Sequence, residues 1–354
     1  MNKKWLKALF AGALSASVLA ACGESEEDAA SEDTGTSEGG TEEAASNEES
    51  GSEDTYVIGA TQIVEHPSLD AAYEGFKEGL ADNGFVEGEN VEYDHQSAQG
   101  DQNNTATIAN NFISEGVDLI FANSTPSAQA ALQASNDTPI IFTSVTDAVE
   151  AGLIDGMDTP GELITGVVDL HPDAINMTVD FISEYFPDST VGMVYNSGEQ
   201  NSVTQIEAVE EAATDSGLEV ETRSVSTSAE VQQATESLVG EADLLYIITD
   251  NTVVSALESV VGIAESQSLP LIVGEPDSLE RGGFATFGIN YHDIGYRAGE
   301  MAAEVLSEES TPADIPAEYP QDMELFINRE AGEAQGVDIH EDWEEEAQFI
   351  NGEE

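Results

Sequence analysis

Short apolar segments alternate with longer amphipathic segments along most of the chain after residue 55. The short segments are almost continuously apolar, which is typical of strands buried on both faces of a parallel sheet. In the longer segments apolar residues recur about every three to four positions, which predicts helices that cover such a sheet. The first half is predicted to contain, in order, strand 56–63, helix 68–83, strand 91–96, helix 103–115, strand 119–122, helix 126–135 and strand 139–145. The second half repeats this order with strand 190–195, helix 203–216, strand 218–225, helix 229–240, strand 244–248, helix 253–266 and strand 270–273.

Two such units in tandem predict an α/β protein with two Rossmann-like lobes, whose strand ends face a common cleft. Three segments are predicted to cross between the lobes, with hinges near Gly166, Gly288 and Tyr319: 163–170, 284–291 and 319–326. The predicted helix 292–307 follows the second crossing and has to return to the first lobe. This arrangement resembles the type I periplasmic binding protein fold, with parallel sheets joined by a three-strand hinge; two independent Rossmann-like domains are the alternative. The expected boundaries are 55–165 with 290–318 for lobe 1, and 166–289 with 319–354 for lobe 2.

The N-terminus has the features of an export signal. Three lysines precede a short apolar run that ends in Leu19-Ala20-Ala21-Cys22. The run is too short to span a hydrocarbon core of about 30 Å, so residues 1–21 are predicted to be a cleaved signal peptide. Cys22 is the only cysteine of the chain, and its position predicts a lipid-anchored protein; a plain secretory signal is the alternative. The exported part then has no disulfide and no thiolate metal site.

The charge of the chain is strongly acidic. There are 72 Asp and Glu residues against 8 Lys and Arg, with a formal net charge of −64. Residues 22–54 combine acids with small polar residues, which predicts a disordered tether between the membrane and the folded part. Nucleic acid is excluded as a partner because too few cations are present to neutralise phosphates. Such a surface is expected of a protein from a saline habitat, where salt screens its self-repulsion.

Motifs for catalysis are missing from the sequence. No glycine-rich G-x-G-x-x-G turn follows the first predicted strand, the chain has no Walker-type loop with lysine, and no G-x-S-x-G elbow lies between a predicted strand and a predicted helix. The histidines are scattered without the spacing of metal ligands: His66, His95, His171, His292 and His340. We therefore expect no enzyme activity, no cofactor and no metal.

The loops at the predicted strand ends are polar and rich in hydroxyl groups. They are residues 62–67, 123–126 and 143–147 in the first lobe, and 196–202, 249–252 and 274–278 in the second. Helices or turns follow these loops, so free backbone N–H groups are available to an anionic group of a ligand. Helix capping explains each residue equally well when it is taken singly. The convergence of six loops on one cleft favours a ligand site.

Several of these runs carry a family resemblance. Thr61-Gln62-Ile63-Val64-Glu65-His66-Pro67-Ser68-Leu69-Asp70, Phe142-Thr143-Ser144-Val145-Thr146-Asp147, Tyr195-Asn196-Ser197-Gly198-Glu199-Gln200-Asn201-Ser202 and Thr249-Asp250-Asn251-Thr252-Val253-Val254 resemble ABC-transporter substrate-binding lipoproteins related to the tryptophan-binding component of Gram-positive bacteria. The resemblance covers residues 56 to about 338. It implies a monomer on the extracytoplasmic face of the cell membrane that hands an amino acid, often an aromatic one, to a permease driven by a cytoplasmic ATPase. The ligand itself is less well defined by the resemblance than the role.

For an amino acid ligand the candidate residues divide by chemistry. Acidic Asp250 and Glu275 are predicted to bind the ammonium group, unless they are merely solvated. For the carboxylate the candidates are Ser124, Thr125 and Thr146 with their neighbouring N–H groups, as similar hydroxyl loops serve amino-acid binders of this fold. Additional hydrogen bonds are expected from Gln62, His66 and Asn196, and walls of the side-chain pocket from Pro67 and Tyr291. The remaining candidates are Thr143, Asp147, Ser197 and Asn251.

Two other functions use the same architecture. Sugar sites usually hold the ring between aromatic side chains, but the exported part has only Trp343, in an acidic tail expected far from the cleft. A sugar or nucleoside ligand is therefore the weaker interpretation. A sensory module that presents its closed form to a membrane receptor fits the sequence as well as a transport component does.

Overall fold

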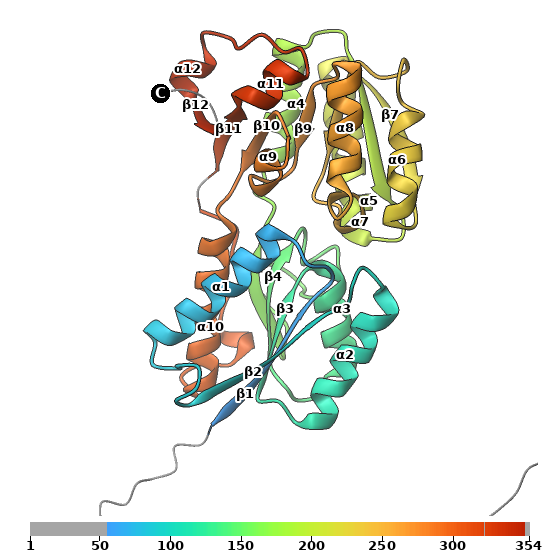
Figure 1. The fold of residues 1–354 in the computed structure, drawn as a ribbon. Coiled ribbons are helices and arrows are strands. Elements are labelled where there is room, and N and C mark those ends of the chain that lie inside the picture. The colour runs from blue at the N-terminus through green and yellow to red at the C-terminus, as the bar shows by residue number, and fades with distance from the viewer. Residues whose placement is uncertain (1–54, 322, 351–354) are drawn as a thin grey trace, which may run out of the picture. The chain divides into compact units, whose positions relative to one another are not determined.

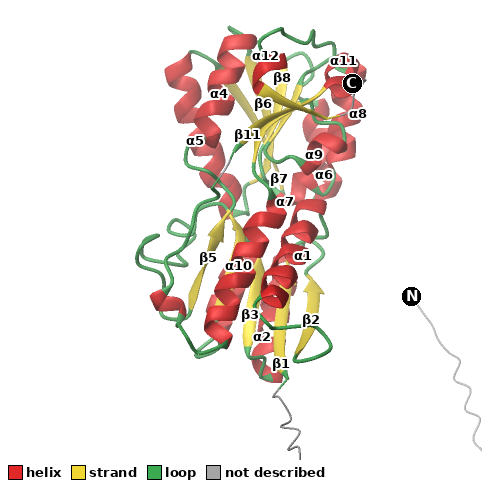
Figure 2. Cartoon of the chain, turned by 90° about the vertical axis from the view of Figure 1, so that its left-hand side faces the viewer, coloured by secondary structure: helices red, strands yellow, loops and turns green. Residues whose placement is uncertain are grey.

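A computed structural model describes residues 55–321 and 323–350. The predicted signal peptide, Cys22 and the acidic tether lie outside these residues. The described residues form two open α/β lobes, each a sheet flanked by helices (Figures 1 and 2). The predicted fold class, a type I periplasmic binding protein fold, is confirmed. In residues 55–321 and 323–350 no helix combines the length and the apolar character needed to cross a bilayer.

Lobe 1 contains a five-stranded parallel sheet in the order β2-β1-β3-β4-β5. Its strands are β1 (Tyr56–Gln62), β2 (Val91–Ser97), β3 (Leu119–Asn123), β4 (Ile140–Val145) and β5 (Ile164–Val168). Its helices are α1 (Pro67–Asp82), α2 (Gln102–Glu115), α3 (Thr125–Ala134) and α10 (Tyr291–Leu306), with a 3-10 turn at Pro312–Asp314. Its strands β3, β4 and β5 are buried along their whole length, as expected of strands in a parallel sheet that is covered on both faces.

Lobe 2 contains a seven-stranded sheet in the order β12-β11-β10-β9-β8-β6-β7, in which β10 and β11 pair antiparallel. Its strands are β6 (Thr190–Asn196), β7 (Glu219–Val225), β8 (Leu244–Ile247), β9 (Leu271–Val273), β10 (Ala285–Gly288), β11 (Glu324–Asn328) and β12 (Ala347–Ile350). Its helices are α4 (Ala174–Tyr185), α5 (Gln200–Ser216), α6 (Ser228–Glu236), α7 (Asn251–Val254), α8 (Leu257–Gln267), α9 (Asp277–Glu280), α11 (Arg329–Ala334) and α12 (Trp343–Glu346).

The structure differs from the sequence prediction in several details, and helix α4 was not predicted at all. The single helix predicted over 253–266 is two, α7 and α8, because Ala256 leaves helical geometry with φ −121° and ψ 23°. Strand β5 belongs to the sheet of lobe 1, so that lobe continues through Val168 instead of ending at residue 165. The acidic tail is folded: Trp343 is buried in the core of lobe 2 against Phe181 and Phe284. The few apolar residues of this tail are separated by acids, so the sequence pattern does not predict that they pack in the core.

The crossings lie next to tightly packed backbone. At Gly166 the φ is +158°, and a Cβ would lie 2.0 Å from the carbonyl oxygen of Phe142. Near the third crossing, Glu318 pairs through its backbone with Gly166 and Val168 at 3.0 Å. The Arg297 guanidinium of α10 holds the Glu318 carboxylate at 2.8 Å. Gly166 and Glu318, the residue before Tyr319, are therefore fixed to lobe 1, whereas Gly288 ends β10 in the sheet of lobe 2. Hinge motion at Gly166, Gly288 and Tyr319 stays a prediction.

Helix α10 returns to lobe 1 and packs along α1, and the two backbones approach closely at glycines (Figures 1 and 2). A Cβ on Gly295 would lie 1.9 Å from the carbonyl oxygen of Ala72, and one on Gly75 would lie 2.1 Å from that of His292. Contacts this short are forbidden to any larger residue, so the glycines permit the close approach. This packing places Tyr291, the first residue of α10, at the cleft.

Candidate functional site

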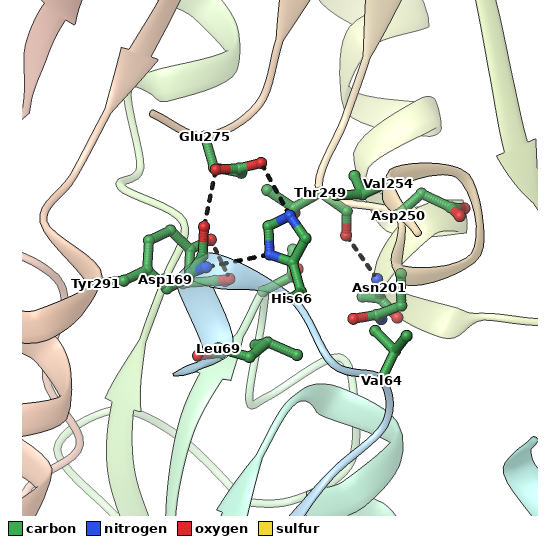
Figure 3. Close-up of a pocket in the computed structure, with 14 residues that line it drawn as sticks. Val64, His66, Leu69, Asp169, Asn201, Thr249, Asp250, Val254, Glu275 and Tyr291 are labelled. Atoms are coloured by element: carbon green, nitrogen blue, oxygen red, sulfur yellow. Dashed lines mark hydrogen bonds and ion pairs between the residues drawn. The ribbon is translucent and has the colours of Figure 1, made fainter. Parts of the chain in front are cut away.

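A pocket lies where the strand-end loops of the two lobes meet, and Figure 3 shows the side chains that line it. The space open to the centre of a water-sized molecule is about 30 Å³, within about 420 Å³ of unoccupied space that includes the open mouth. Parallel strands end at one edge of each sheet, so the residues that follow several strands are collected here. The lining residues are Val64, His66, Ser68, Leu69, Ser144, Thr146, Asp169, Asn201, Thr249, Asp250, Asn251, Val254, Glu275 and Tyr291.

His66 precedes α1 and caps it. Its Nδ1 accepts a hydrogen bond from the backbone N–H of Ser68 at 3.2 Å. Burial, and secondarily Arg281, lowers the pKa of His66 to about 4, so the imidazole is neutral at pH 7 and Nε2 carries the hydrogen. This Nε2 lies 3.5 Å from Glu275 Oε1 and forms no hydrogen bond with any described residue. It is a donor available to a ligand.

Asp169 follows β5 directly and presents one free oxygen. The Tyr291 hydroxyl donates to Asp169 Oδ2 at 2.9 Å, whereas Oδ1 is buried and has no hydrogen-bond partner in the described part of the chain. Burial raises the pKa of Asp169 to about 6. Next to Asp169, the pairing of β4 with β5 departs from regular register, and Ser144 has a φ of 55°. The Ser144 hydroxyl is buried and likewise has no hydrogen-bond partner among residues 55–321 and 323–350. This part of the pocket offers both a free acceptor and a free donor.

Glu275 faces the pocket from the loop after β9. Its Oε2 accepts from the Ser68 hydroxyl at 2.8 Å and from the Ser278 N–H at 3.1 Å, and its Oε1 contacts the Ser278 hydroxyl. Burial raises the pKa of this carboxyl above its usual range. Both oxygens already have partners in the protein. Ammonium binding by Glu275 stays a prediction.

Asp250, the other predicted ammonium ligand, caps α7. Its Oδ2 accepts from the Asn196 N–H at 2.6 Å and its Oδ1 accepts from the Val253 N–H at 2.8 Å. Burial, reinforced by the charge of Glu199, raises the pKa of Asp250 to about 7. In Figure 3 the carboxylate points away from His66. Both oxygens of Asp250 therefore serve its own lobe as caps, and ammonium binding by Asp250 stays a prediction.

Replacing Asp250 by alanine is accordingly expected to reduce stability. The partly buried N–H group of Asn196 and the buried one of Val253 would lose their acceptor, which should lower the free energy of unfolding by about 1 to 3 kcal/mol in urea denaturation. The control is Asp101→Ala, which removes the exposed cap of α2 and should cost less. A variant of normal stability that no longer binds ligand would contradict the capping role.

Hydrogen bonds cross the cleft between the lobes. Gln205 of α5 donates to the Thr146 hydroxyl of lobe 1 at 3.3 Å and to Thr249 of its own lobe at 2.7 Å. Farther out, Gln102 of α2 donates to the Gly198 carbonyl at 3.0 Å. With the contact between Ser68 and Glu275, these bonds hold the lobes in a closed arrangement.

The pocket brings together part of the set predicted from the sequence. His66, Thr146, Asp250, Asn251, Glu275 and Tyr291 line it. The other predicted residues are not among its lining: Gln62, Pro67, Ser124, Thr125, Thr143, Asp147, Asn196 and Ser197.

The residues outside the pocket mostly stabilise the loops themselves. Gln62 donates to the Asp70 carboxylate at 2.9 Å, and Ser124 accepts from the N–H of Ser127 at the start of α3. Asp147 accepts from two N–H groups of its own turn at 2.9 Å. Two further candidates are exposed to solvent, Pro67 and Ser197. Capping and turn formation account for these polar residues, as their types allow.

Sequence reasoning missed several lining residues. They are Val64, Ser68, Leu69, Ser144, Asp169, Asn201, Thr249 and Val254. The signal for Asp169 was present, because it is an acid directly after a continuously apolar strand at a predicted crossing. Within the described ranges no group of three or more His, Cys, Asp or Glu residues is arranged to hold a metal ion.

Comparison with known proteins gives the family. A family model described as ABC transporter substrate binding protein matches residues 57–349. The chain belongs to this family. A tyrosine-binding protein of Clostridioides difficile is 39% identical to this substrate-binding protein over 330 residues, which are 93% of this chain and 91% of the relative.

Solved structures of substrate-binding proteins agree with the closed arrangement. A Streptococcus pneumoniae ABC domain in complex with L-Trp is 32% identical, with a TM-score of 0.79 over 84% of this chain and 100% of that chain. The ligand-free, open structure of a substrate binding protein with adhesive properties from Clostridium difficile is 39% identical over the same shares of the two chains, with a TM-score of 0.63. The higher score belongs to the ligand-bound structure although its identity is lower. This difference is consistent with the hydrogen bonds that cross the cleft.

Proposed function

We propose that this substrate-binding protein captures an amino acid with an aromatic side chain and delivers it to the permease of an ABC importer. It acts outside the cytoplasmic membrane, to which the lipid on Cys22 attaches it. The observation that carries the proposal is the free, buried Oδ1 of Asp169 in the interlobe pocket. The tyrosine-binding relative and the structure with bound L-Trp support the ligand class.

Asp169 suits an ammonium group because its carboxylate is buried and only half satisfied. Tyr291 holds Oδ2 and thereby orients Oδ1. Partnering by a cation offsets the cost of keeping a carboxylate charged away from water. We therefore assign the ammonium group to Asp169, in place of Asp250 and Glu275.

The ligand carboxylate needs donors, and two are unoccupied. His66 Nε2–H and the Ser144 hydroxyl are both buried and unpartnered among the described residues. A neutral imidazole donates without requiring a charge of its own to be buried. The acidic surface of the protein repels free anions at long range, whereas a zwitterion carries no net charge and is not repelled in this way.

The remaining walls suit an apolar side chain. Val64, Leu69 and Val254 supply aliphatic surface, and Tyr291 supplies an aromatic ring. Burying an aromatic side chain against such surface contributes roughly 2 to 3 kcal/mol. The pocket lining contains no tryptophan, so a sugar would lack the aromatic pair that usually holds its ring.

A thermal-shift screen of amino acids, nucleosides and sugars tests the proposal. Tyrosine, tryptophan or phenylalanine is expected to raise the melting temperature, because a ligand at a hundred times its Kd stabilises the folded state by about 2.7 kcal/mol. The N-acetylated forms of the same amino acids are the matched controls and should give no shift, since they lack the ammonium group. Stabilisation by sugars or nucleosides alone would contradict the amino acid proposal.

A further inference from the structure

The hydroxyl of Ser68 is placed between two carboxyl groups of the opposite lobe. Ser68 lies in the first turn of α1, in lobe 1, whereas Glu275 and Asp277 lie at the start of α9, in lobe 2. Its Oγ is 2.8 Å from Glu275 Oε2 and 2.6 Å from Asp277 Oδ2. Ser68 and Glu275 are buried, and Asp277 is partly buried.

We call Ser68, Glu275 and Asp277 together the junction. If both of its carboxyls are ionised, it has too few hydrogen atoms for Ser68 to form a hydrogen bond with each of them. A serine hydroxyl has one hydrogen and donates it to one acceptor, while an ionised carboxylate is an acceptor only. If Ser68 donates to one carboxylate, the other contact joins two oxygens without a hydrogen between them. Both contacts become hydrogen bonds when one carboxyl is protonated and donates to Ser68 Oγ. In the closed arrangement both contacts are therefore hydrogen bonds when Glu275 and Asp277 together carry one proton.

Among the charged and titratable groups around these carboxyls Arg281 is the positive one, and its effect on the pKa of Glu275 is smaller than that of burial. These groups are His66 and Asp70 near the start of α1, Asp169 after β5, Glu258 on α8, Arg281 after α9 and Tyr291 on α10. His66 is neutral because burial lowers its pKa. The Arg281 guanidinium bonds the Glu258 carboxylate at 2.9 and 3.0 Å. Burial raises the pKa of Glu275 and of Asp277, in the direction that the hydrogen count requires.

We propose that closure of the lobes takes up one proton, which Glu275 and Asp277 share around the Ser68 hydroxyl. This junction regulates the site described above, so its effect on ligand affinity rests on the proposed function. In the open form the carboxyls separate from Ser68 and regain water, and their affinity for the proton returns toward that of an ordinary carboxyl, with a pKa of about 4. Closure is then fully favoured below that value and loses this contribution as the pH rises through the higher pKa of the closed form.

Calorimetry of ligand binding in buffers of different ionisation enthalpy measures the proton uptake. At about pH 6 we expect the wild type to take up more protons per bound aromatic amino acid than Asp277→Asn, by up to about one. The asparagine amide donates to Ser68 Oγ permanently, so this variant should retain binding and exceed the wild-type affinity by about tenfold at about pH 8. Glu280→Gln, at an exposed position at the end of α9, is the matched control and should behave like the wild type.

Small-angle X-ray scattering of the ligand-free protein tests the junction independently of the ligand. The wild type is expected to become more compact as the pH falls, whereas Asp277→Asn should already be compact at about pH 8. Ser68→Ala should lose the pH-dependent compaction because the bridging hydroxyl is gone. Identical pH profiles of scattering for the wild type and Asp277→Asn would overturn the proposal. If no amino acid bound, the proposed function would be wrong. The scattering of the ligand-free protein would still test whether closure takes up a proton at the junction.

Discussion

Replacing Asp169 by asparagine is expected to weaken binding of an aromatic amino acid roughly tenfold to a hundredfold. The substitution keeps the size of the side chain but removes the negative charge opposite the ligand ammonium group. Charge-assisted hydrogen bonds contribute about 1.5 to 3 kcal/mol, which corresponds to this range of affinity. Tyr291 holds Oδ2 of Asp169, so its free Oδ1 is the atom that the change disables. Isothermal titration calorimetry measures the loss directly.

The pH dependence of the same binding step adds a second readout. Burial raises the pKa of Asp169 to about 6 in the ligand-free pocket, and an ammonium partner lowers it. The bound state therefore holds fewer protons at this residue, and its contribution to affinity is full above about pH 6 and lost as the pH falls below it. In Asp169→Asn this loss of affinity at low pH should disappear. The pH dependence predicted from the junction of Ser68, Glu275 and Asp277 should remain.

The control for Asp169 is Asp173→Asn, an exposed acid a few residues farther along the chain. It has the same change of charge and should leave affinity unchanged. Near-normal affinity of Asp169→Asn, or an equal loss in Asp173→Asn, would remove Asp169 from the site.

Replacing Gly295 by alanine is expected to destabilise the protein, although alanine is the better helix former. In an unobstructed helix interior the change from glycine to alanine stabilises by about 0.5 to 1 kcal/mol. At Gly295 the new Cβ would lie 1.9 Å from the Ala72 carbonyl oxygen, and α1 would have to move away from α10. Overpacking of this kind costs about 1 to 3 kcal/mol and outweighs the gain in propensity. Urea denaturation followed by circular dichroism measures the change.

Gly262 provides the opposite case within the same chain. It lies inside α8, and a Cβ built on it meets nothing within 4 Å. Gly262→Ala should therefore raise the free energy of unfolding by about 0.5 to 1 kcal/mol. If both substitutions changed stability in the same direction, the close packing of α1 and α10 would not be the reason for glycine at residue 295.

Most of the architecture was predictable because it depends on local patterns. Strands such as β3 and β4 begin with apolar runs, and helices such as α2 and α5 begin after polar loops and end at glycine, so these elements were visible without their neighbours. Strand β5 was predicted only as a crossing between the lobes. The return of α10 to lobe 1 followed from the order of the elements. The final acidic segment was harder, because Trp343 joins the core through aromatic contacts with residues far away in the sequence.

The candidate site was predictable only at the level of its loops. Sequence reasoning placed the ligand at the strand ends, and the pocket lies there. It assigned the ammonium group to Asp250 because that acid lies in a strand-end loop, but the same position lets it cap α7 with both oxygens. It missed Asp169, whose free oxygen becomes apparent only when Tyr291 is placed beside it, 122 residues farther along the chain.

The sequence by itself determined the two-lobed α/β fold, the place of the pocket at the strand ends and the expectation of export with a lipid anchor, although the predicted loop 123–126 contributes no residue to the pocket lining. Hydrophobic periodicity and short motifs are local properties, and one chain is enough to display them. Only the tertiary structure decided which polar groups remain free and which are consumed by caps and turns. Ser68 meets Glu275 across 207 residues of chain, and the hydrogen bonds that such partners make depend on the packing of both lobes together. The number of hydrogen atoms available at that contact, and with it the predicted pH dependence of closure, follows from three-dimensional neighbours that no local pattern specifies.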